Sequence, residues 1–194
     1  MTRMLKAGVA PPPELAGTPT VSLHGSVDDA MLSTWLEALA QARTGSGPLV
    51  LELGTTGGDA EVGRRIAEDI RLFREHTGRR ALFLGRTTVY SAGATIMAGF
   101  PRADRWLGRD AVVMIHGRKL QKCLNIEGPL RSERRRVEAL LAEIDEGLRI
   151  EREGFERLVE GSDVSLEELE RQTVGDWYLT AEEAVERGLV AGLI

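Results

Sequence analysis

The fold is decided by residues 48–85, which read PLVLELGTTGGDAEVGRRIAEDIRLFREHTGRRALFLG. The apolar runs at 48–53 and 81–85 have the length and composition of buried strands. Between them, residues 59–76 carry apolar side chains at helical spacing among charged ones, which predicts an amphipathic helix. A strand, a helix and a second strand in this order predict a βαβ unit, whose two strands run parallel.

The same alternation continues on both sides of this unit. The further predicted elements are strands at 21–25, 105–107 and 111–115 and helices at 28–42 and 91–99. Strands and helices that alternate along a chain predict an α/β fold with a largely parallel sheet.

The last third of the chain begins with a long charged helix. Over residues 129–160, apolar side chains recur every three or four positions among charged ones, which predicts one amphipathic helix. Two capping boxes follow, Ser165 with Glu168 and Thr180 with Glu183, and each marks the start of a further helix.

The start of the chain has a different composition. Residues 1–20 hold four prolines in a polar, glycine-containing setting, which favours a flexible, extended arm without a helix. The whole chain has 194 residues, 42% of them hydrophobic, which suits one globular domain. We therefore expect an arm over 1–20 and a single domain over 21–194.

Charge and cysteine content narrow the classes of partner and compartment. The net charge is −5, and the one basic run, at 131–136, lies beside glutamates in the helical pattern, so nucleic acid is not expected as a partner. Cys123 is the single cysteine and cannot form an internal disulfide, which fits a reducing compartment. The sequence has neither a run of ~18 apolar residues nor a signal-peptide core. We predict a soluble cytoplasmic protein without membrane contact.

Two adjacent glycines stand in GTTGGDA (54–60), where a strand gives way to a helix. Glycine at such a junction lets the backbone approach a ligand closely and leaves N–H groups free to point at a negative charge. The alternative is a simple turn. The stretch matches neither GxxxxGK[ST] nor GxGxxG, so it does not predict a nucleotide site.

Ser91 and His116 are the two side chains that could carry chemistry. Ser91 opens the helix of TTVYSAGATIMAG (87–99) after a strand and loop, where a hydroxyl is either an N-cap or a nucleophile. The stretch is not the hydrolase elbow GxSxG, because Val89 occupies the first glycine position. His116 ends the buried strand of VVMIHG (112–117), where a histidine is either structural or a general base.

Together these stretches resemble one family, the ClpP-type proteolytic subunits, over roughly residues 21–194. The family pattern runs SPGG, then ASMG or a close variant, then MIHQP. The corresponding segments here are TTGG (55–58), YSAG (90–93) and MIHG (114–117).

The spacing and the end of the chain strengthen this resemblance. Ser91 and His116 lie 25 positions apart, a spacing that the family also favours. The segment TVGDWYLTAEEAVERGLV (173–190) is similar to the family's terminal block, in which an aspartate precedes an aromatic residue. That match selects Asp176 from many acidic residues.

The resemblance implies a ClpP/crotonase-like α/β fold of repeated βαβ units, with a mostly parallel sheet and a long protruding handle helix. It implies a serine endopeptidase that hydrolyses unfolded proteins or peptides inside an oligomeric chamber, without a metal or other cofactor. Ser91 would be the nucleophile, His116 the general base, and Asp176 the residue that orients the imidazole. The backbone N–H groups of Gly58 and Ala92 would form the oxyanion hole.

The resemblance also implies partners. Members of the family assemble as stacked heptameric rings and work with a hexameric ATPase that unfolds substrates, so a homo-oligomeric ring and an ATPase unfoldase are expected here. The aromatic pockets that receive the ATPase are not recognisable in this chain, which has only 2 Tyr and 4 Phe.

The sequence departs from the family pattern in three places. Thr56 replaces the proline before the two glycines, and the proline after the histidine is missing from residues 117–122, so a different cleavage preference is expected. His116 and Asp176 are 60 positions apart, more than in typical members, and we place the extra length in the helix at 129–160.

Three alternative functions remain open at this point. A catalytically silent ClpP-like scaffold or ring subunit would keep the fold without needing Ser, His and Asp at the three matched positions. A crotonase-like acyl-CoA enzyme would use paired backbone N–H groups to hold a thioester oxyanion and would not need the triad. A peptidase limited to short peptides would keep the triad.

Overall fold

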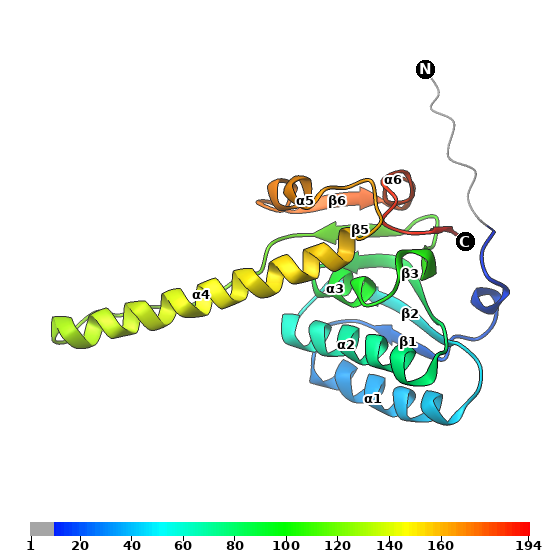
Figure 1. Ribbon diagram of the computed structural model, residues 1–194, viewed down its shortest axis with the longest axis horizontal. Coiled ribbons are helices and arrows are strands. Elements are labelled where there is room, and N and C mark those ends of the chain that lie inside the picture. The colour runs from blue at the N-terminus through cyan, green and yellow to red at the C-terminus, as the bar shows by residue number, and fades with distance from the viewer. Residues whose placement is uncertain (1–9) are drawn as a thin grey trace, which may run out of the picture.

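The computed structural model describes residues 10–194 (Figure 1). The helices are α1 (Asp29–Thr44), α2 (Ala60–Thr77), α3 (Ala92–Ala98), α4 (Leu130–Val159), α5 (Leu166–Gln172) and α6 (Ala181–Glu186), with the 3-10 turns η1 (Pro13–Ala16) and η2 (Arg102–Asp104). The strands are β1 (Val21–His24), β2 (Leu49–Thr55), β3 (Ala81–Tyr90), β4 (Arg105–Leu107), β5 (Val112–Ile115), β6 (Trp177–Thr180) and β7 (Gly192–Leu193).

Seven strands form one sheet. β1, β2, β3, β4 and β7 follow one another across it and run parallel. β5 lies parallel beside the second half of β3, and β6 pairs antiparallel with β5. The predicted α/β fold with a mostly parallel sheet is therefore confirmed.

β3 is longer than the sequence pattern predicted and continues through Tyr90. Its first half pairs with β4 around Leu84, and its second half pairs with β5 around Val89. The polar residues at 86–88 interrupt the apolar run, so the sequence pattern did not indicate the second half of the strand. Pairing with β5 keeps this half extended. Ser91 therefore follows β3 directly, with no loop between them.

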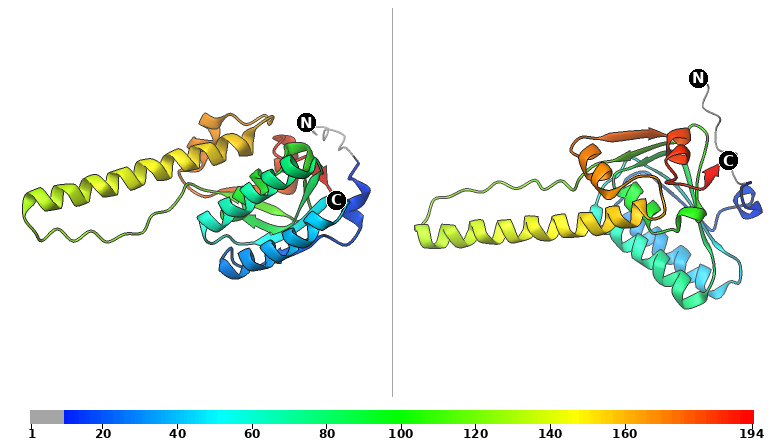
Figure 2. Two further views of the ribbon diagram at one scale, coloured as in Figure 1. Left: turned by 60° about the horizontal axis from the view of Figure 1, so that its bottom comes forward. Right: turned by 45° about the horizontal axis from the view of Figure 1, so that its top comes forward.

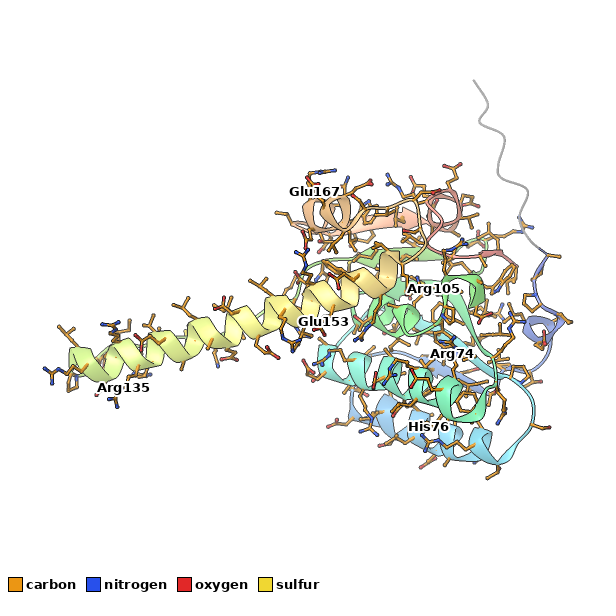
Figure 3. All side chains as sticks on the ribbon, in the orientation of Figure 1. Arg74, His76, Arg105, Arg135, Glu153 and Glu167 are labelled. Carbon is orange, nitrogen blue, oxygen red and sulfur yellow. The ribbon has the colours of Figure 1, made fainter. Side chains whose placement is uncertain are left out.

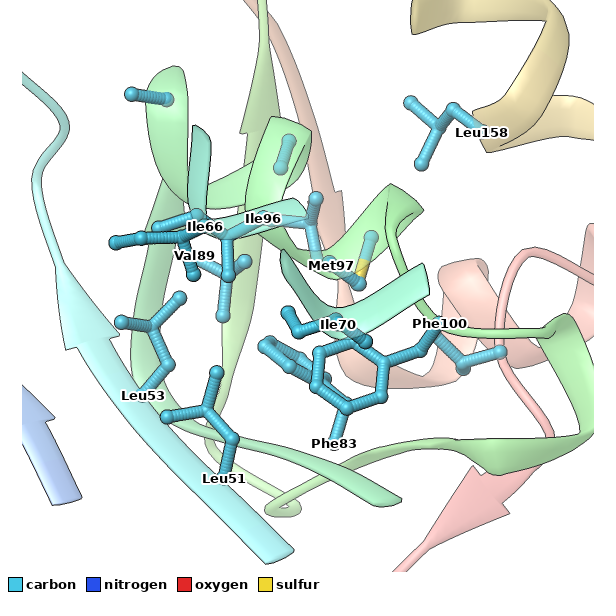
Figure 4. Close-up of a cluster of buried hydrophobic side chains, with 14 of the residues drawn as sticks. Leu51, Leu53, Ile66, Ile70, Phe83, Val89, Ile96, Met97, Phe100 and Leu158 are labelled. Atoms are coloured by element: carbon cyan, nitrogen blue, oxygen red, sulfur yellow. The ribbon is translucent and has the colours of Figure 1, made fainter. Parts of the chain in front are cut away.

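The first two helices cover one face of the sheet. Along β2, Leu51 and Leu53 belong to the main core, whereas Val50 between them belongs to a smaller cluster, as the two-residue period of a strand requires. Figure 4 shows Leu51 and Leu53 near Ile66 and Ile70 of α2, all of them fully buried. Burial of this apolar face fixes the position of α2, whose first turn borders the candidate site.

The smaller cluster also holds part of the predicted arm. Residues 13–16 form η1, and Leu15 packs with Val50 and Trp106. This part of the arm differs from the expected helix-free stretch, because its one large apolar side chain meets an apolar patch of the sheet. Residues 1–9 of the arm lie outside the described residues, and a domain boundary at residue 20 stays a prediction.

α4 projects far from the rest of the molecule (Figures 1 and 2). Its 30 residues span ~45 Å at about 1.5 Å per residue. Phe155 and Leu158, near its end, are buried against the body, whereas Leu130 and Leu141 on the projecting part are exposed. The protruding handle helix is confirmed. Charged residues are frequent along it, and none of the helices within residues 10–194 is long and apolar enough to span a membrane.

The end of the chain adds the antiparallel strand β6, which the sequence pattern did not reveal. Thr180 forms the predicted capping box with Glu183, while Ser165 accepts a hydrogen bond from the Glu168 N–H. β6 occupies the four residues up to Thr180, a run too short to stand out beside the capping box. Its pairing with β5 brings the start of β6 beside His116.

Candidate active site

Ser91 sits at the sharp junction between β3 and α3 with φ 55° and ψ −114°. Within residues 10–194, it is the one non-glycine residue with a positive φ, a conformation that costs about 1–3 kcal/mol and persists where the surroundings enforce it. Its N–H donates to the Met114 carbonyl of β5 at 2.8 Å. Its side chain makes no capping hydrogen bond, so the N-cap alternative does not explain the residue.

The two adjacent glycines are required by their backbone angles and by close contacts. Gly57 has φ 103°, and a Cβ there would lie 2.7 Å from the Ser91 Cβ. Gly58 has φ 149°, and a Cβ there would lie 2.3 Å from the Val27 carbonyl oxygen. The 57–58 turn therefore fits against Ser91 only when it carries no side chains.

The hydrogen bonds of Val27 fix the direction of the Gly58 N–H. Val27 donates to the Gly57 carbonyl at 3.0 Å and accepts from the Asp59 N–H at 2.7 Å. Val27 and Gly58 form a parallel bridge, in which Val27 bonds the two neighbours of Gly58. In such a bridge Gly58 itself turns its N–H to the other side of its strand. The Gly58 N–H therefore points away from Val27.

Ala92 supplies the second predicted donor. It is the first residue of α3, and the first N–H groups of a helix have no acceptor within the helix. The α3 start is held close to α2, because a Cβ at Gly63 would lie 3.1 Å from the Ala92 carbonyl oxygen. The place of the Ala92 N–H is thus set by packing between two helices.

These groups open into one cavity of about 480 Å³, here called the Ser91 cavity, between the start of α2, α3, the end of β5 and α4. Ser91 and His116 both line it, and so do Gly58 and Ala92. The volume is in the range of a ligand site. Within residues 10–194, His, Cys, Asp and Glu side chains form no group of three that could hold a metal ion.

His116 follows β5 and is half-buried. Its Nδ1 lies 2.5 Å from the carbonyl oxygen of Gly117, so the Nδ1–H donates to that oxygen. A proton on Nδ1 leaves a lone pair on Nε2, which is the tautomer that a general base needs. The backbone of the next residue thus holds the imidazole in this structure.

Asp176 precedes β6 and is exposed. One of its carboxylate oxygens lies 3.8 Å from the Lys119 Nζ. It does not line the Ser91 cavity, and no hydrogen bond within residues 10–194 joins it to His116. Of the three predicted triad residues, the structure brings Ser91 and His116 into one cavity and leaves the Asp176 side chain outside it.

The segment at 117–119, which follows His116, is tied down at several points that the sequence did not indicate. The Gly117 N–H donates to the Thr173 carbonyl at 3.2 Å, and the Arg118 N–H donates to the Glu151 carboxylate of α4. The Arg118 guanidinium also bonds Glu61 of α2. In the sequence these carboxylates are members of charged helical faces, and no local pattern distinguishes them from their neighbours.

Comparison with known proteins identifies the family of this chain. The family model described as Clp protease matches residues 13–194. The ATP-dependent Clp protease proteolytic subunit 2 of Pseudomonas aeruginosa is 28% identical over 176 residues, which are 90% of this chain and 80% of that protein. A solved structure of a ClpP1 mutant from Listeria monocytogenes has the same fold, with a TM-score of 0.72, 20% identity and 94% of each chain covered. Since the family model spans nearly all of the sequence, this chain belongs to the Clp protease family.

Proposed function

We propose that the protein is a serine endopeptidase that hydrolyses unfolded proteins or peptides. One observation carries the proposal: Ser91, held in a strained conformation at a strand–helix junction, shares a cavity with His116 and with Gly58 and Ala92. Strain at such a position is typical of a residue that the fold holds for a function. Membership of the Clp protease family supports the same reaction.

In the proposed reaction, the Ser91 Oγ attacks the carbonyl carbon of the scissile peptide while the His116 Nε2 takes the hydroxyl proton. The N–H groups of Gly58 and Ala92 donate to the oxyanion of the tetrahedral intermediate. Collapse of the intermediate breaks the C–N bond, and the imidazolium gives its proton to the leaving amine. A water molecule, deprotonated by His116, then hydrolyses the acyl-serine ester and frees Ser91.

Asp176 is the proposed orienting residue. When the His116 imidazole turns from Gly117 toward Asp176, the Nδ1–H gains a charged acceptor in place of a neutral carbonyl. A carboxylate there stabilises the imidazolium that forms during attack. The contacts of Asp176 with Lys119 and of His116 with Gly117 describe a resting form of this site.

We further propose that the protein acts as a homo-oligomeric ring, with an ATPase as partner, in the cytoplasm. The projecting half of α4 exposes large apolar side chains, among them Leu130 at 85% and Leu141 at 54%. Leu120 and Ile126, which precede the helix, are also exposed, at 50% and 55% respectively. An apolar face of this kind supports contact with another copy of the chain. The name of the Pseudomonas protein, an ATP-dependent proteolytic subunit, supports the ATPase partner.

Covalent labelling of Ser91 tests the proposed function. A fluorophosphonate probe should modify the protein once per chain, at Ser91, and Ser91→Ala should abolish the labelling. His116→Ala should slow labelling strongly, because the hydroxyl loses its base. Absence of labelling from the assembled oligomer would instead favour the silent scaffold, and persistent labelling in Ser91→Ala would assign the reactive nucleophile to another residue. Binding of an acyl-CoA without labelling would favour the crotonase-like enzyme.

A further inference from the structure

A second cavity adjoins the Ser91 cavity. It has a volume of about 420 Å³ and lies between α2, the segment after α3, and the C-terminal half of α4. The two cavities share four lining residues, which are Arg64, Thr95, Ile150 and Gly154. They are therefore neighbouring parts of one groove under α4.

The second cavity, here called the arginine cavity, is strongly positive. Three glutamates line it, against six arginines: Arg64, Arg71, Arg74, Arg102, Arg105 and Arg157. In a chain with a net charge of −5, this is a local excess of positive charge. Figure 3 shows Arg74 on α2, Glu153 on α4 and Arg105 near the end of α4.

Two of the three glutamates that line the arginine cavity are already paired with arginines. Glu68 lies 2.5 Å from the Arg71 guanidinium, and this hydrogen bond holds the pKa of Glu68 below its ordinary value. Glu153 bonds Arg149, which lies outside the cavity. The Glu68–Arg71 pair therefore cancels within the cavity, and Glu153 is neutralised from outside, which leaves five arginines against Glu160.

Three of the arginines keep their donors available. The side chains of Arg74, Arg102 and Arg157 make no hydrogen bond or ion pair with another side chain within residues 10–194. A guanidinium presents several N–H donors in a planar fork that matches a carboxylate. The arginine cavity thus offers unused donors of the type that binds carboxylates.

Arg105 adds a charge that the surroundings hold in place. It is 2% exposed, and its guanidinium donates to the carbonyls of Phe100 at 2.8 Å, Leu158 at 2.7 Å and Arg157 at 3.0 Å. Burial lowers its pKa to about 10, so it is still a cation at neutral pH. Its donors are used by carbonyls, and its contribution to the cavity is a fixed positive charge.

Gly154 stands where the two cavities meet. A glycine inside a helix costs about 0.5–1 kcal/mol relative to alanine. A Cβ at Gly154 would have no atom within 4 Å, so packing does not demand a glycine there. The missing side chain leaves the passage between the Ser91 cavity and the arginine cavity open.

We propose that the arginine cavity is a substrate subsite that binds a carboxylate of the peptide, so that the peptidase prefers substrates with an acidic group near the scissile bond. The inference rests on the proposed function, because it takes the groove to begin at Ser91. Charge-assisted hydrogen bonds from arginine to a carboxylate are stronger than those to a neutral amide. The subsite therefore discriminates glutamate from the nearly isosteric glutamine.

Matched peptides test this specificity. Internally quenched peptides with blocked ends would carry Glu or Gln at one position at a time on either side of the scissile bond. At one or two neighbouring positions, kcat/KM should be about ten- to hundredfold higher for the Glu peptide than for the Gln peptide. A difference of this size corresponds to the free energy of one charged hydrogen bond. A second pair of peptides has no acidic side chain, and one member has a free C-terminus while the other is amidated. This pair tests whether the bound carboxylate is the C-terminus of the substrate or a side chain.

Two sets of variants locate the preference in the arginine cavity. Arg102→Gln combined with Arg157→Gln should bring the Glu-to-Gln ratio to about one, and high salt should reduce the ratio in the unaltered protein. Gly154→Leu should lower the ratio by narrowing the passage. Gly147→Leu is its matched control, because Gly147 lies within the same helix, also has no atom near its Cβ position and lines neither cavity.

The outcomes separate this inference from the proposed function. Equal cleavage of Glu and Gln peptides at every position would overturn the subsite, as would a preference that survives the double arginine change. A change in the sedimentation of the oligomer without a change in the ratio would assign the cavity to a contact between copies. If no peptide is cleaved and Ser91 is not labelled, fluorescence anisotropy with Ser91→Ala still decides: tighter binding of the Glu peptide is expected, and equal binding would refute the subsite.

Discussion

Ile115 and Trp177 are Cα partners at the end of the antiparallel pair formed by β5 and β6. One further step along this register, beyond its last pair, would set His116 opposite Asp176, and side chains directly opposite one another have Cβ atoms about 4.5–5.5 Å apart. The two residues therefore lie directly beyond the same end of the β5–β6 pair, where Gly117 bonds Thr173 and does not continue this register. Their side chains are engaged elsewhere, His116 with the Gly117 carbonyl and Asp176 with Lys119. We expect side-chain rotation, without a new strand register, to bring them together.

Replacing Lys119 by glutamine is expected to increase activity, because it releases the Asp176 carboxylate toward His116. Both partners are well exposed, and such pairs contribute about 0–1 kcal/mol, so kcat/KM for a neutral peptide should increase by no more than about fivefold. Lys122→Gln is the matched control, since it breaks an ion pair with Glu143. A decrease confined to Lys119→Gln would assign the lysine to substrate binding.

Changing Asp176 to asparagine is expected to lower kcat by about 10²–10⁴, with a much smaller effect on KM, because an amide can hold the wrong imidazole tautomer. Steady-state kinetics on a blocked peptide measure this. Asp110→Asn, in an exposed turn, is a control for the loss of one negative charge. A loss below about tenfold would mean that the Gly117 carbonyl is the working acceptor of the His116 Nδ1–H, and Asp176 would lose its proposed role.

Much of the fold could be predicted from the sequence, because its signals are local. The apolar runs of β2 and β3 correspond to strands that are buried on both faces, and the three-to-four-residue period of α4 corresponds to an apolar stripe that is buried only near Phe155 and Leu158. The signal failed where pairing between distant segments decides the structure. Residues 86–90 extend β3 beside β5, and Trp177–Thr180 form β6 on the other side of β5, although neither stretch is a continuous apolar run.

The candidate site divides in the same way. Motifs at Gly58, Ser91 and His116 predicted residues that the structure gathers in one cavity. The acceptor of the His116 Nδ1–H could not be predicted, because it is a backbone carbonyl oxygen, which every residue carries and no side-chain pattern marks. Glu151 could not be predicted either, since its partner Arg118 is 33 positions away and α4 holds many equivalent carboxylates.

Gly57 is expected to tolerate no side chain. Gly57→Ala would force an L-residue to adopt φ 103° and place a Cβ 2.7 Å from the Ser91 Cβ. We expect a loss of about 1–3 kcal/mol in the free energy of unfolding and about 10²-fold slower fluorophosphonate labelling of Ser91. Gly47→Ala is the matched control, because a Cβ there meets no atom within 4 Å. If Gly57→Ala and Gly47→Ala slow the labelling of Ser91 equally, Gly57 does not shape the site.

Glu151 is expected to hold the 117–119 segment against α4. Its carboxylate accepts the Arg118 N–H, so Glu151→Ala frees this backbone donor, and amide hydrogen exchange at 117–119 should become faster while β5 (Val112–Ile115) keeps its protection. Glu151→Gln retains an acceptor oxygen and should restore most of the protection, whereas Glu146→Ala, which removes an ion pair with Arg149 farther along α4, should leave the segment unchanged.

Glu151→Ala should also affect substrate binding, because the 117–119 segment follows His116 and lines the Ser91 cavity. A substrate main chain that pairs with this segment needs the Arg118 N–H, which Glu151 occupies in the resting form. Glu151→Ala should therefore lower KM for blocked peptides without a matching change in kcat. If exchange and KM both stay unaltered, the segment is held by the Gly117 bond to Thr173 and the Arg118 bond to Glu61, and Glu151 does not control it.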